Sequence, residues 1–171
     1  FTVGGLLLTG LPILLAGGVL LAQNFSHFAF ASVVTELRPT HAILLPTMVA
    51  VLRHASSWPQ VDLSGFAAIG SGASTVPESV AEELLARGVP RFLHLYGSTE
   101  CLTPVMVHVS TAQTTGPRTI FSRFCGDYQA RLAEDGELLL RGTPVMRGYV
   151  GDPTINQEAC GEGWFRTGDL F

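Results

Sequence analysis

The 171-residue chain is apolar for its length, since 47% of its residues are hydrophobic and only 14% are charged. This composition excludes intrinsic disorder, and the length suffices for the core of one domain or slightly more. The net charge of −4, from 10 Lys and Arg against 14 Asp and Glu, excludes a broad basic surface for nucleic acids. The mean hydropathy of +0.35 indicates either a bilayer location or a surface that other parts of a larger protein cover.

Residues 3–22 carry no charge and are long enough to span a membrane. Glycines and a proline interrupt this run and favour a short helix, a turn and a short strand in a buried α/β core. The interrupting residues are Gly4, Gly5, Gly10, Pro12, Gly17 and Gly18. We therefore expect no membrane span and a cytoplasmic protein. The three cysteines form no Cys-x-x-Cys pattern, which indicates free thiols rather than a metal site.

Helix and strand patterns alternate through the first hundred residues. Residues 28–37 have the apolar spacing of a helix, which must end before Pro39. Residues 41–45 form a short apolar run, typical of a buried parallel strand. Residues 47–54 are predicted to form the next helix, with Thr47 as its N-cap.

The second half of this region repeats the pattern. Residues 66–69 predict a second buried strand, and residues 70–74 predict a turn of small side chains. Residues 75–78 match a capping box, and the helix that it opens should end at Gly88 in a left-handed conformation. Residues 91–96 predict a third strand. This alternation is typical of a parallel sheet with flanking helices.

The pattern changes after Pro104. Residues 110–117 are polar and rich in Thr and Gly, which indicates a linker or surface loop. Beyond it, residues 128–132 and 137–141 have strand patterns, and the segment ending at Gly136 between them is typical of a hairpin turn.

These patterns predict an α/β fold, in which a parallel sheet with flanking helices is followed by a small antiparallel β subdomain. We expect the α/β nucleotide-binding subdomain to occupy residues 1–109 and the β-rich subdomain to occupy residues 118–171, each of them in part. Residues 110–117 would connect the two.

Ligands of parallel α/β sheets bind outside the carboxyl ends of the strands, and the small-residue turn after the second strand is one candidate. Its residues are Gly70, Ser71, Gly72, Ala73 and Ser74. Small side chains let a flat or phosphorylated ligand approach the backbone closely. The segment lacks the third glycine of a dinucleotide fingerprint and both glycines of a nucleophile elbow. By itself it fits an ordinary tight turn equally well.

The second candidate follows the third strand and reads Tyr96-Gly97-Ser98-Thr99-Glu100. The Tyr96 ring can stack on a base, the Thr99 hydroxyl can donate to a phosphate, and Glu100 offers hard oxygen ligands to Mg²⁺. From residue types alone, an ordinary strand-to-loop turn is as consistent with this segment as a nucleotide and metal site.

Three further motifs follow in order: GELLLRG at 136–142, Arg-Gly-Tyr at 147–149 and GWFRTGDL at 163–170. Together with Tyr-Gly-Ser-Thr-Glu upstream, they resemble the adenylate-forming superfamily. That superfamily comprises acyl-CoA synthetases, the adenylation domains of nonribosomal peptide synthetases, and luciferases. The resemblance covers nearly the whole chain but only the central part of the family's large N-terminal domain.

The resemblance implies a two-step ligase, in which a carboxylate reacts with ATP to give an acyl-adenylate and a thiol then takes the acyl group. The thiol would belong to CoA or to the phosphopantetheine of a carrier protein. By motif, Thr99 would contact phosphate, Glu100 would hold Mg²⁺, and Asp169 would accept the ribose hydroxyls. The remaining nucleotide-binding residues would be Gly70, Ser71, Gly72, Ala73, Tyr96, Gly97 and Ser98.

The resemblance also implies partners. A phosphate loop before Phe1 and a C-terminal domain carrying a lysine would complete the same enzyme, so the 171-residue chain is expected to be inactive alone. The small side chains around the site suit a fatty or aryl acid. Thr2 stands where many relatives have a histidine, and residues 116–126 match the family's glycine-rich stretch poorly. These departures leave a second hypothesis: a non-catalytic module that serves as a scaffold or docking piece in a larger synthase.

Overall fold

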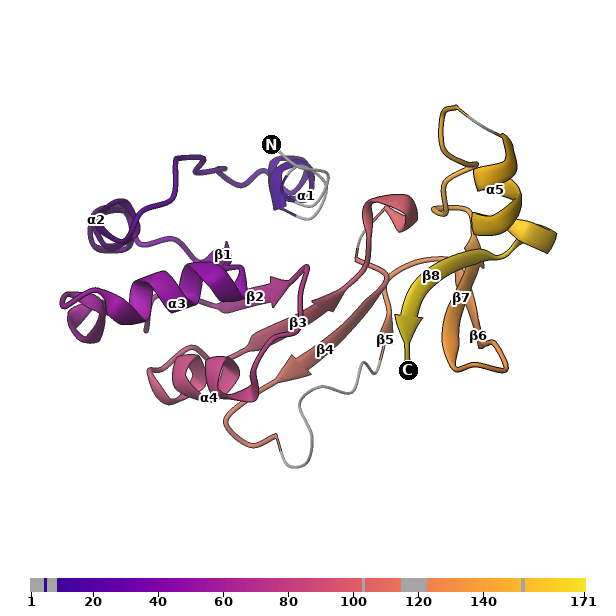
Figure 1. Cartoon of the computed structure of the whole chain (residues 1–171). Helices are drawn as coiled ribbons and strands as arrows, with labels where there is room; N and C mark the ends of the chain where they lie inside the picture. The colour runs from indigo at the N-terminus through magenta and orange to yellow at the C-terminus, as the bar shows by residue number, and fades with distance from the viewer. Residues whose placement is uncertain (1–4, 6–8, 103, 115–122, 152) are drawn as a thin grey trace.

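The computed structural model describes residues 5, 9–102, 104–114, 123–151 and 153–171 (Figure 1). The expectations about Thr2 and about residues 115–122 lie outside this part of the chain. Among the described residues, no helix combines the length and the apolar character that crossing a bilayer requires.

The larger sheet has five strands in the order β1-β2-β3-β4-β5. Strands β1 (His41–Ile43), β2 (Ala68–Gly72) and β3 (Phe92–Tyr96) are parallel. Strand β4 (Met106–Ser110) runs antiparallel to β3, and the short β5 (Arg123–Phe124) runs antiparallel to β4. Three parallel strands were predicted, although the second lies at residues 68–72 rather than 66–69. No strand was predicted over residues 106–110, and Ser110 was expected to begin a loop.

Helices flank the parallel strands, as Figure 1 shows for α2 (His27–Leu37), α3 (Pro46–His54) and α4 (Glu78–Ala86). Helix α2 is capped by the Ser26 hydroxyl, which accepts a hydrogen bond from the backbone N–H of Ala29 at 3.1 Å. In the described part of the N-terminal segment, the short helix α1 spans Leu11–Leu15, residues 9 and 10 before it are also helical, and residues 16–26 contain no strand.

Two predicted helix caps are wrong. Helix α3 begins at Pro46, one residue before the expected cap Thr47, because proline's fixed φ suits the first helical position. Helix α4 begins at Glu78 after Pro77, and no side chain caps it, so the predicted capping box of Thr75 does not form. Its end is as predicted, since Gly88 has a φ of +92°.

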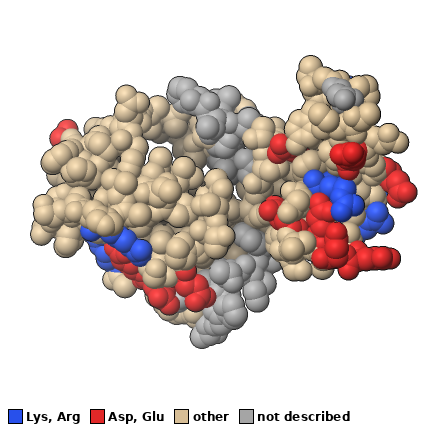
Figure 2. Space-filling model, in the orientation of Figure 1, with Lys and Arg blue, Asp and Glu red and all other residues tan. Residues whose placement is uncertain are grey.

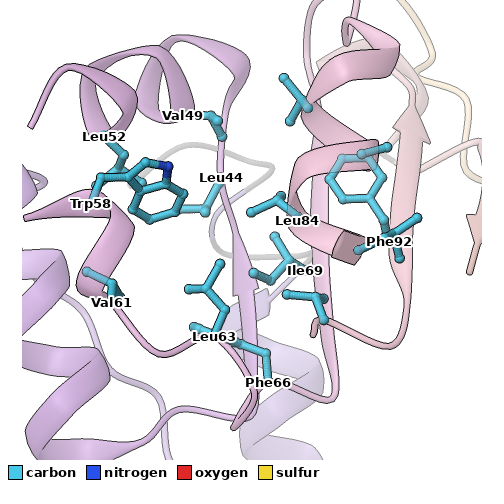
Figure 3. Packing of buried hydrophobic residues seen from close by; sticks show 14 of the residues in the cluster. Leu44, Val49, Leu52, Trp58, Val61, Leu63, Phe66, Ile69, Leu84 and Phe92 are labelled. Carbon is cyan, nitrogen blue, oxygen red and sulfur yellow. The ribbon is translucent and has the colours of Figure 1, made fainter. Parts of the chain in front are cut away.

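The main core lies between this sheet and its helices (Figure 3). Trp58 of the short 3₁₀ helix Trp58–Gln60 packs there with Leu52 and Leu84, and Ile69 and Phe92 contribute from neighbouring strands. Ile69 and Phe92 are fully buried and face each other in the β2–β3 register. This packing fixes the parallel strands, whose carboxyl ends carry the candidate site.

The second sheet is antiparallel, in the order β6 (Tyr128–Leu132), β7 (Glu137–Gly142) and β8 (Phe165–Leu170). The β6–β7 turn uses Gly136 at a φ of +86°, as the hairpin prediction requires. Helix α5 (Pro153–Ala159) precedes β8.

A second apolar cluster connects the two sheets. Its buried residues are Cys101, Val105, Met106, Leu138, Leu140 and Phe165. The first three follow β3 or lie in β4, and the others come from β7 and β8. The predicted fold class, a helix-flanked α/β sheet followed by a small antiparallel sheet, is therefore confirmed.

Charged side chains of both signs lie together on the face that Figure 2 shows, near α3 and α4 and again over the second sheet. Arg53 pairs with Glu83 at 2.5 Å, and Arg166 lies 3.7 Å from Asp135. Most of the remaining surface in this view is uncharged. Basic groups are thus neutralised locally on this face and do not form a continuous basic surface.

Candidate active site

The site begins at the carboxyl end of the central strand β3, where Tyr96 is its last residue. Gly97 and Ser98 turn the chain, and the 3₁₀ turn Thr99–Cys101 follows. Cys101 is buried in the cluster between the sheets, which anchors the turn and leaves Thr99 exposed and Glu100 partly exposed. The structure therefore places the chemistry-bearing side chains at the sheet edge where α/β ligands bind.

The predicted turn at residues 70–74 is largely strand. Gly70, Ser71 and Gly72 lie in β2 and are buried, and the chain leaves the sheet only at Ala73, whose φ is +66°. A Cβ on Gly72 would lie 2.3 Å from the carbonyl oxygen of Leu95. These glycines thus let β2 and β3 approach each other, a packing role that the turn interpretation did not anticipate.

Ser71 is fully buried, and its Oγ has no hydrogen-bond partner among the described residues. It faces His94 across the β2–β3 pairing. Ala73 and Ser74 are the exposed residues of this segment. Ala73 and Ser74, rather than Gly70 or Ser71, therefore offer the surface that a ligand can reach.

Asp169 of β8 meets Tyr96 of β3. The Tyr96 hydroxyl donates a hydrogen bond to Oδ2 of Asp169 at 2.6 Å, and the Phe171 ring packs edge-on against the Tyr96 ring with centroids 5.3 Å apart. Burial raises the pKa of the Tyr96 hydroxyl well above its ordinary value, and the bond to Asp169 raises it further. Tyr96 therefore stays protonated and acts as a donor at physiological pH.

The Thr167-Gly168-Asp169 segment of β8 is held by the neighbouring strand β7. The backbone N–H of Gly168 donates to the Glu137 carboxylate at 2.8 Å, and the Thr167 hydroxyl donates to the carbonyl of Leu138 at 2.8 Å. Glu137 is nearly buried and also pairs with Arg166. Asp169 thus lies in an irregular part of β8 whose backbone is fixed by β7 on one side.

Glu100 is contacted by a loop that lies far along the chain. The Tyr149 hydroxyl donates to Oε1 of Glu100 at 2.9 Å, and the backbone N–H of Met146 donates to the Glu100 carbonyl at 2.7 Å. Hydrogen bonding by its own backbone N–H lowers the pKa of the Glu100 carboxyl, and Tyr149 adds to this effect against the opposing influence of burial. Glu100 is therefore ionised at neutral pH.

The Tyr96–Asp169 pair and the Tyr149–Glu100 pair both join the end of β3 to the second sheet or the loop beside it. A pocket also lies at the other, amino-terminal end of β1 and β2, where Arg38 and Asp62 are among its lining residues. Because ligands of such sheets bind at the carboxyl ends of the strands, the convergent carboxylates mark the better candidate.

Comparisons with known proteins show the family to which the chain belongs. Residues 1–150 match the family model described as AMP-binding enzyme. The chain belongs to this family. It is 32% identical to the indoleacetate–CoA ligase of Aromatoleum aromaticum over 99% of the chain and 35% of that protein. It is 34% identical to a feruloyl-CoA synthase of an Amycolatopsis species over 94% of the chain and 34% of that protein. The chain thus spans about a third of the length of these curated relatives.

Among solved structures, the o-succinylbenzoate coenzyme A synthetase of Bacillus subtilis, in complex with ATP and magnesium ion, matches with a TM-score of 0.69. The match covers 95% of this chain and 36% of that one at 22% identity, and it shows that the two share a fold. The predicted membership of the adenylate-forming superfamily is therefore confirmed, whereas the individual site roles stay predictions.

Sequence reasoning named Tyr96, Glu100 and Asp169 but missed Tyr149 as a partner of Glu100. Its signal was present, because Tyr149 belongs to the Arg-Gly-Tyr motif, but that motif had served only to identify the family. Tyr128 was missed as well, although its hydroxyl donates to the carbonyl of Cys101 and supports the turn that carries Glu100.

Proposed function

We propose that this chain forms the nucleotide- and metal-binding part of an ATP-dependent, carboxylate-activating ligase. The main support is that two carboxylates lie at the carboxyl end of β3: Asp169 accepts a hydrogen bond from Tyr96, the last residue of the strand, and Glu100 follows in the next turn, where Tyr149 contacts it. The enzyme would form an acyl-adenylate and pyrophosphate, and would then transfer the acyl group to a thiol.

The donor set fits Mg²⁺. In the described part of the chain no three His, Cys, Asp or Glu side chains gather into a metal cage. Mg²⁺ is commonly held by one or two carboxylates together with substrate phosphates, rather than by a cage made only of protein ligands. Glu100 supplies such a carboxylate, since Tyr149 contacts Oε1 and the residue remains partly exposed. When bound, the metal would neutralise charge that develops on the phosphates.

The other roles follow from position and chemistry. The exposed Thr99 hydroxyl would donate to a phosphate, and Tyr96, Gly97 and Ser98 would flank the adenine. Of the segment Gly70–Ala73, the exposed Ala73 would contribute to the same contact, because the other three residues are buried in β2. Asp169 would accept the ribose hydroxyls, because an ionised carboxylate has enough lone pairs for several donors besides Tyr96. In the first step the acid's carboxylate attacks the α-phosphorus and pyrophosphate leaves. In the second, a thiol attacks the acyl carbonyl and AMP leaves.

We further propose an aryl acid as substrate and CoA as acceptor. The indoleacetate–CoA ligase and the feruloyl-CoA synthase, which match nearly the whole chain, are named for aromatic acids and for CoA. The small residues Ala73 and Gly97 near the site suit the approach of a flat ring. A carrier-protein phosphopantetheine in place of CoA would appear as activation without a CoA thioester product.

The test is acid-dependent ATP–pyrophosphate exchange by the whole protein that carries these residues, with indoleacetate, ferulate, benzoate and octanoate as acids. We expect exchange with the aryl acids and a loss of about 10²-fold or more in Glu100→Gln, the size typical of losing an electrostatic contact to the transition state. Glu158→Gln, at an exposed position of α5, is the matched control.

Two outcomes would contradict the proposal. Absence of exchange with every acid in the unaltered protein would favour the non-catalytic scaffold. Exchange that Glu100→Gln leaves unchanged would remove Glu100 from the metal site.

A further inference from the structure

We infer that Tyr149 is a positioning residue for the Glu100 carboxylate and that Asn156 of α5 holds Tyr149 in place. The inference rests on the proposed function, because it assumes that Glu100 faces a Mg²⁺–ATP complex. The inference gives Tyr149 and Asn156 specific positioning roles, which the Arg-Gly-Tyr motif alone does not explain.

The contact between Tyr149 and Glu100 is a side-chain hydrogen bond of 2.9 Å across 49 residues of sequence. The hydroxyl donates to Oε1 and, together with the backbone N–H of Glu100 and the Ser98 side chain, restricts rotation of the carboxylate. Glu100 sits in a single 3₁₀ turn, which by itself leaves a long side chain several rotamers. A fixed donor therefore selects one of them before the metal binds.

The Tyr149 backbone is held on both sides by one side chain. The N–H of Tyr149 donates to Oδ1 of Asn156 at 2.6 Å, and Nδ2 of Asn156 donates to the carbonyl of Tyr149 at 2.9 Å. An amide side chain offers an acceptor and a donor in one plane, so it can satisfy both groups of one residue. The Tyr149 side chain is 42% exposed and contributes little packing. The two hydrogen bonds with Asn156, here called the Asn156 clamp, therefore determine where the Tyr149 backbone lies.

Gly148 makes the clamp possible. Its φ is +147°, and a Cβ at this position would lie 2.7 Å from Oδ1 of Asn156. Any larger residue would displace the amide. The Arg-Gly-Tyr motif therefore requires glycine at this position because Asn156 approaches its backbone so closely.

The same loop contacts Glu100 a second time, since the Met146 N–H donates to the Glu100 carbonyl at 2.7 Å. The backbone and the carboxylate of Glu100 are thus both tied to residues 146–149. Asn156 and Tyr149 touch neither nucleotide nor metal in this scheme and act only through Glu100.

The experiment measures Mn²⁺ binding by electron paramagnetic resonance, with the whole protein and a non-hydrolysable ATP analogue. We expect Tyr149→Phe, which removes one hydroxyl and keeps the ring, to weaken Mn²⁺ binding about ten-fold, as for a lost hydrogen bond to a charged group. Asn156→Ala should weaken it in the same direction. Gln157→Ala, at the next and exposed position of α5, is the matched control and should bind like the unaltered protein.

The double variant Tyr149→Phe/Asn156→Ala separates positioning from general loosening. If Asn156 acts through the Tyr149 hydroxyl, the double variant binds Mn²⁺ as weakly as Tyr149→Phe alone. Additive losses, or an unchanged affinity in Asn156→Ala, would remove Asn156 from the scheme. Unchanged affinity in Tyr149→Phe would overturn the inference while leaving the ligase proposal intact. Failure of the unaltered protein to bind Mn²⁺ with the analogue would instead count against the proposed function itself.

Discussion

The hydroxyl of Tyr96 donates a 2.6 Å hydrogen bond to Oδ2 of Asp169, although 73 residues separate them in the sequence. One residue ends the central strand of the first sheet and the other lies in the last strand of the second. The bond therefore ties the two sheets together at the edge where the nucleotide is proposed to bind. It also fixes one oxygen of a carboxylate whose proposed task is to accept ribose hydroxyls.

Removing only that hydroxyl should affect nucleotide binding more than turnover. In Tyr96→Phe the ring can still stack on a base, but Asp169 loses a donor and gains freedom to rotate. We expect the KM for ATP to rise about ten-fold with a smaller change in kcat, since a hydrogen bond to a charged group contributes roughly 1.5–3 kcal/mol and the lower end of that range is about ten-fold. Steady-state exchange kinetics measure both values, and a selective loss of kcat would argue against this role.

Gly72 should tolerate no side chain. A Cβ there would lie 2.3 Å from the backbone oxygen of Leu95, an atom that cannot move without disturbing β3. We expect Gly72→Ala to destabilise the fold by about 1–3 kcal/mol, as overpacking does elsewhere. Gly65→Ala is the matched control, because nothing lies within 4 Å of its added Cβ. The two variants are compared by their thermal unfolding midpoints, and equal midpoints would show that β2 and β3 can move apart without loss of stability.

Local patterns predicted the elements that local chemistry determines. Strand β6 (Tyr128–Leu132) agrees with the prediction at both ends, and the helix end at Gly88 agrees because a left-handed glycine is a local signal. The Thr75 cap failed because Pro77 already sets the backbone at the helix start. Strand β4 was missed although residues 105–109 read Val-Met-Val-His-Val, a β-branched run typical of a strand, and it pairs with β3, as in Tyr96 opposite Met106.

The same distinction between local and long-range signals applies to the residues of the candidate site. Tyr96, Glu100 and Asp169 could be named from the sequence because each lies in a short motif. Their partners could not, since the hydroxyl of Tyr149 reaches Glu100 only when the loop before α5 folds back on the turn after β3. The folded chain brings Tyr149 and Glu100 together across 49 residues of sequence, a distance over which no local pattern predicts a contact.

The stability of the region around the site should depend strongly on Leu140. It is fully buried in the cluster that packs β7 against Cys101 and Met106, which flank the turn carrying Glu100. We expect Leu140→Ala to cost about 2–5 kcal/mol, the usual range for a large core residue reduced to alanine. Leu132→Ala, which alters a side chain 54% exposed in β6, should change stability little. Chemical denaturation of both variants tests this, and similar losses would mean that the cluster does not carry the second sheet.

Tyr128 makes the fold sensitive to alkaline pH. Burial raises the pKa of its hydroxyl from 10.0 to about 12, and the hydroxyl donates to the Cys101 carbonyl. Because the pKa is higher in the folded state, the stabilisation is fully present below pH 10 and is lost as the pH rises towards 12. Absorbance at 295 nm, taken as the difference between the protein and Tyr128→Phe, should show ionisation near pH 12 when folded and near pH 10 in guanidinium. Stability should accordingly fall more steeply above pH 10 in the unaltered protein than in Tyr128→Phe. A folded-state transition near pH 10 would mean that this hydroxyl is open to solvent and does not support the turn that holds Glu100.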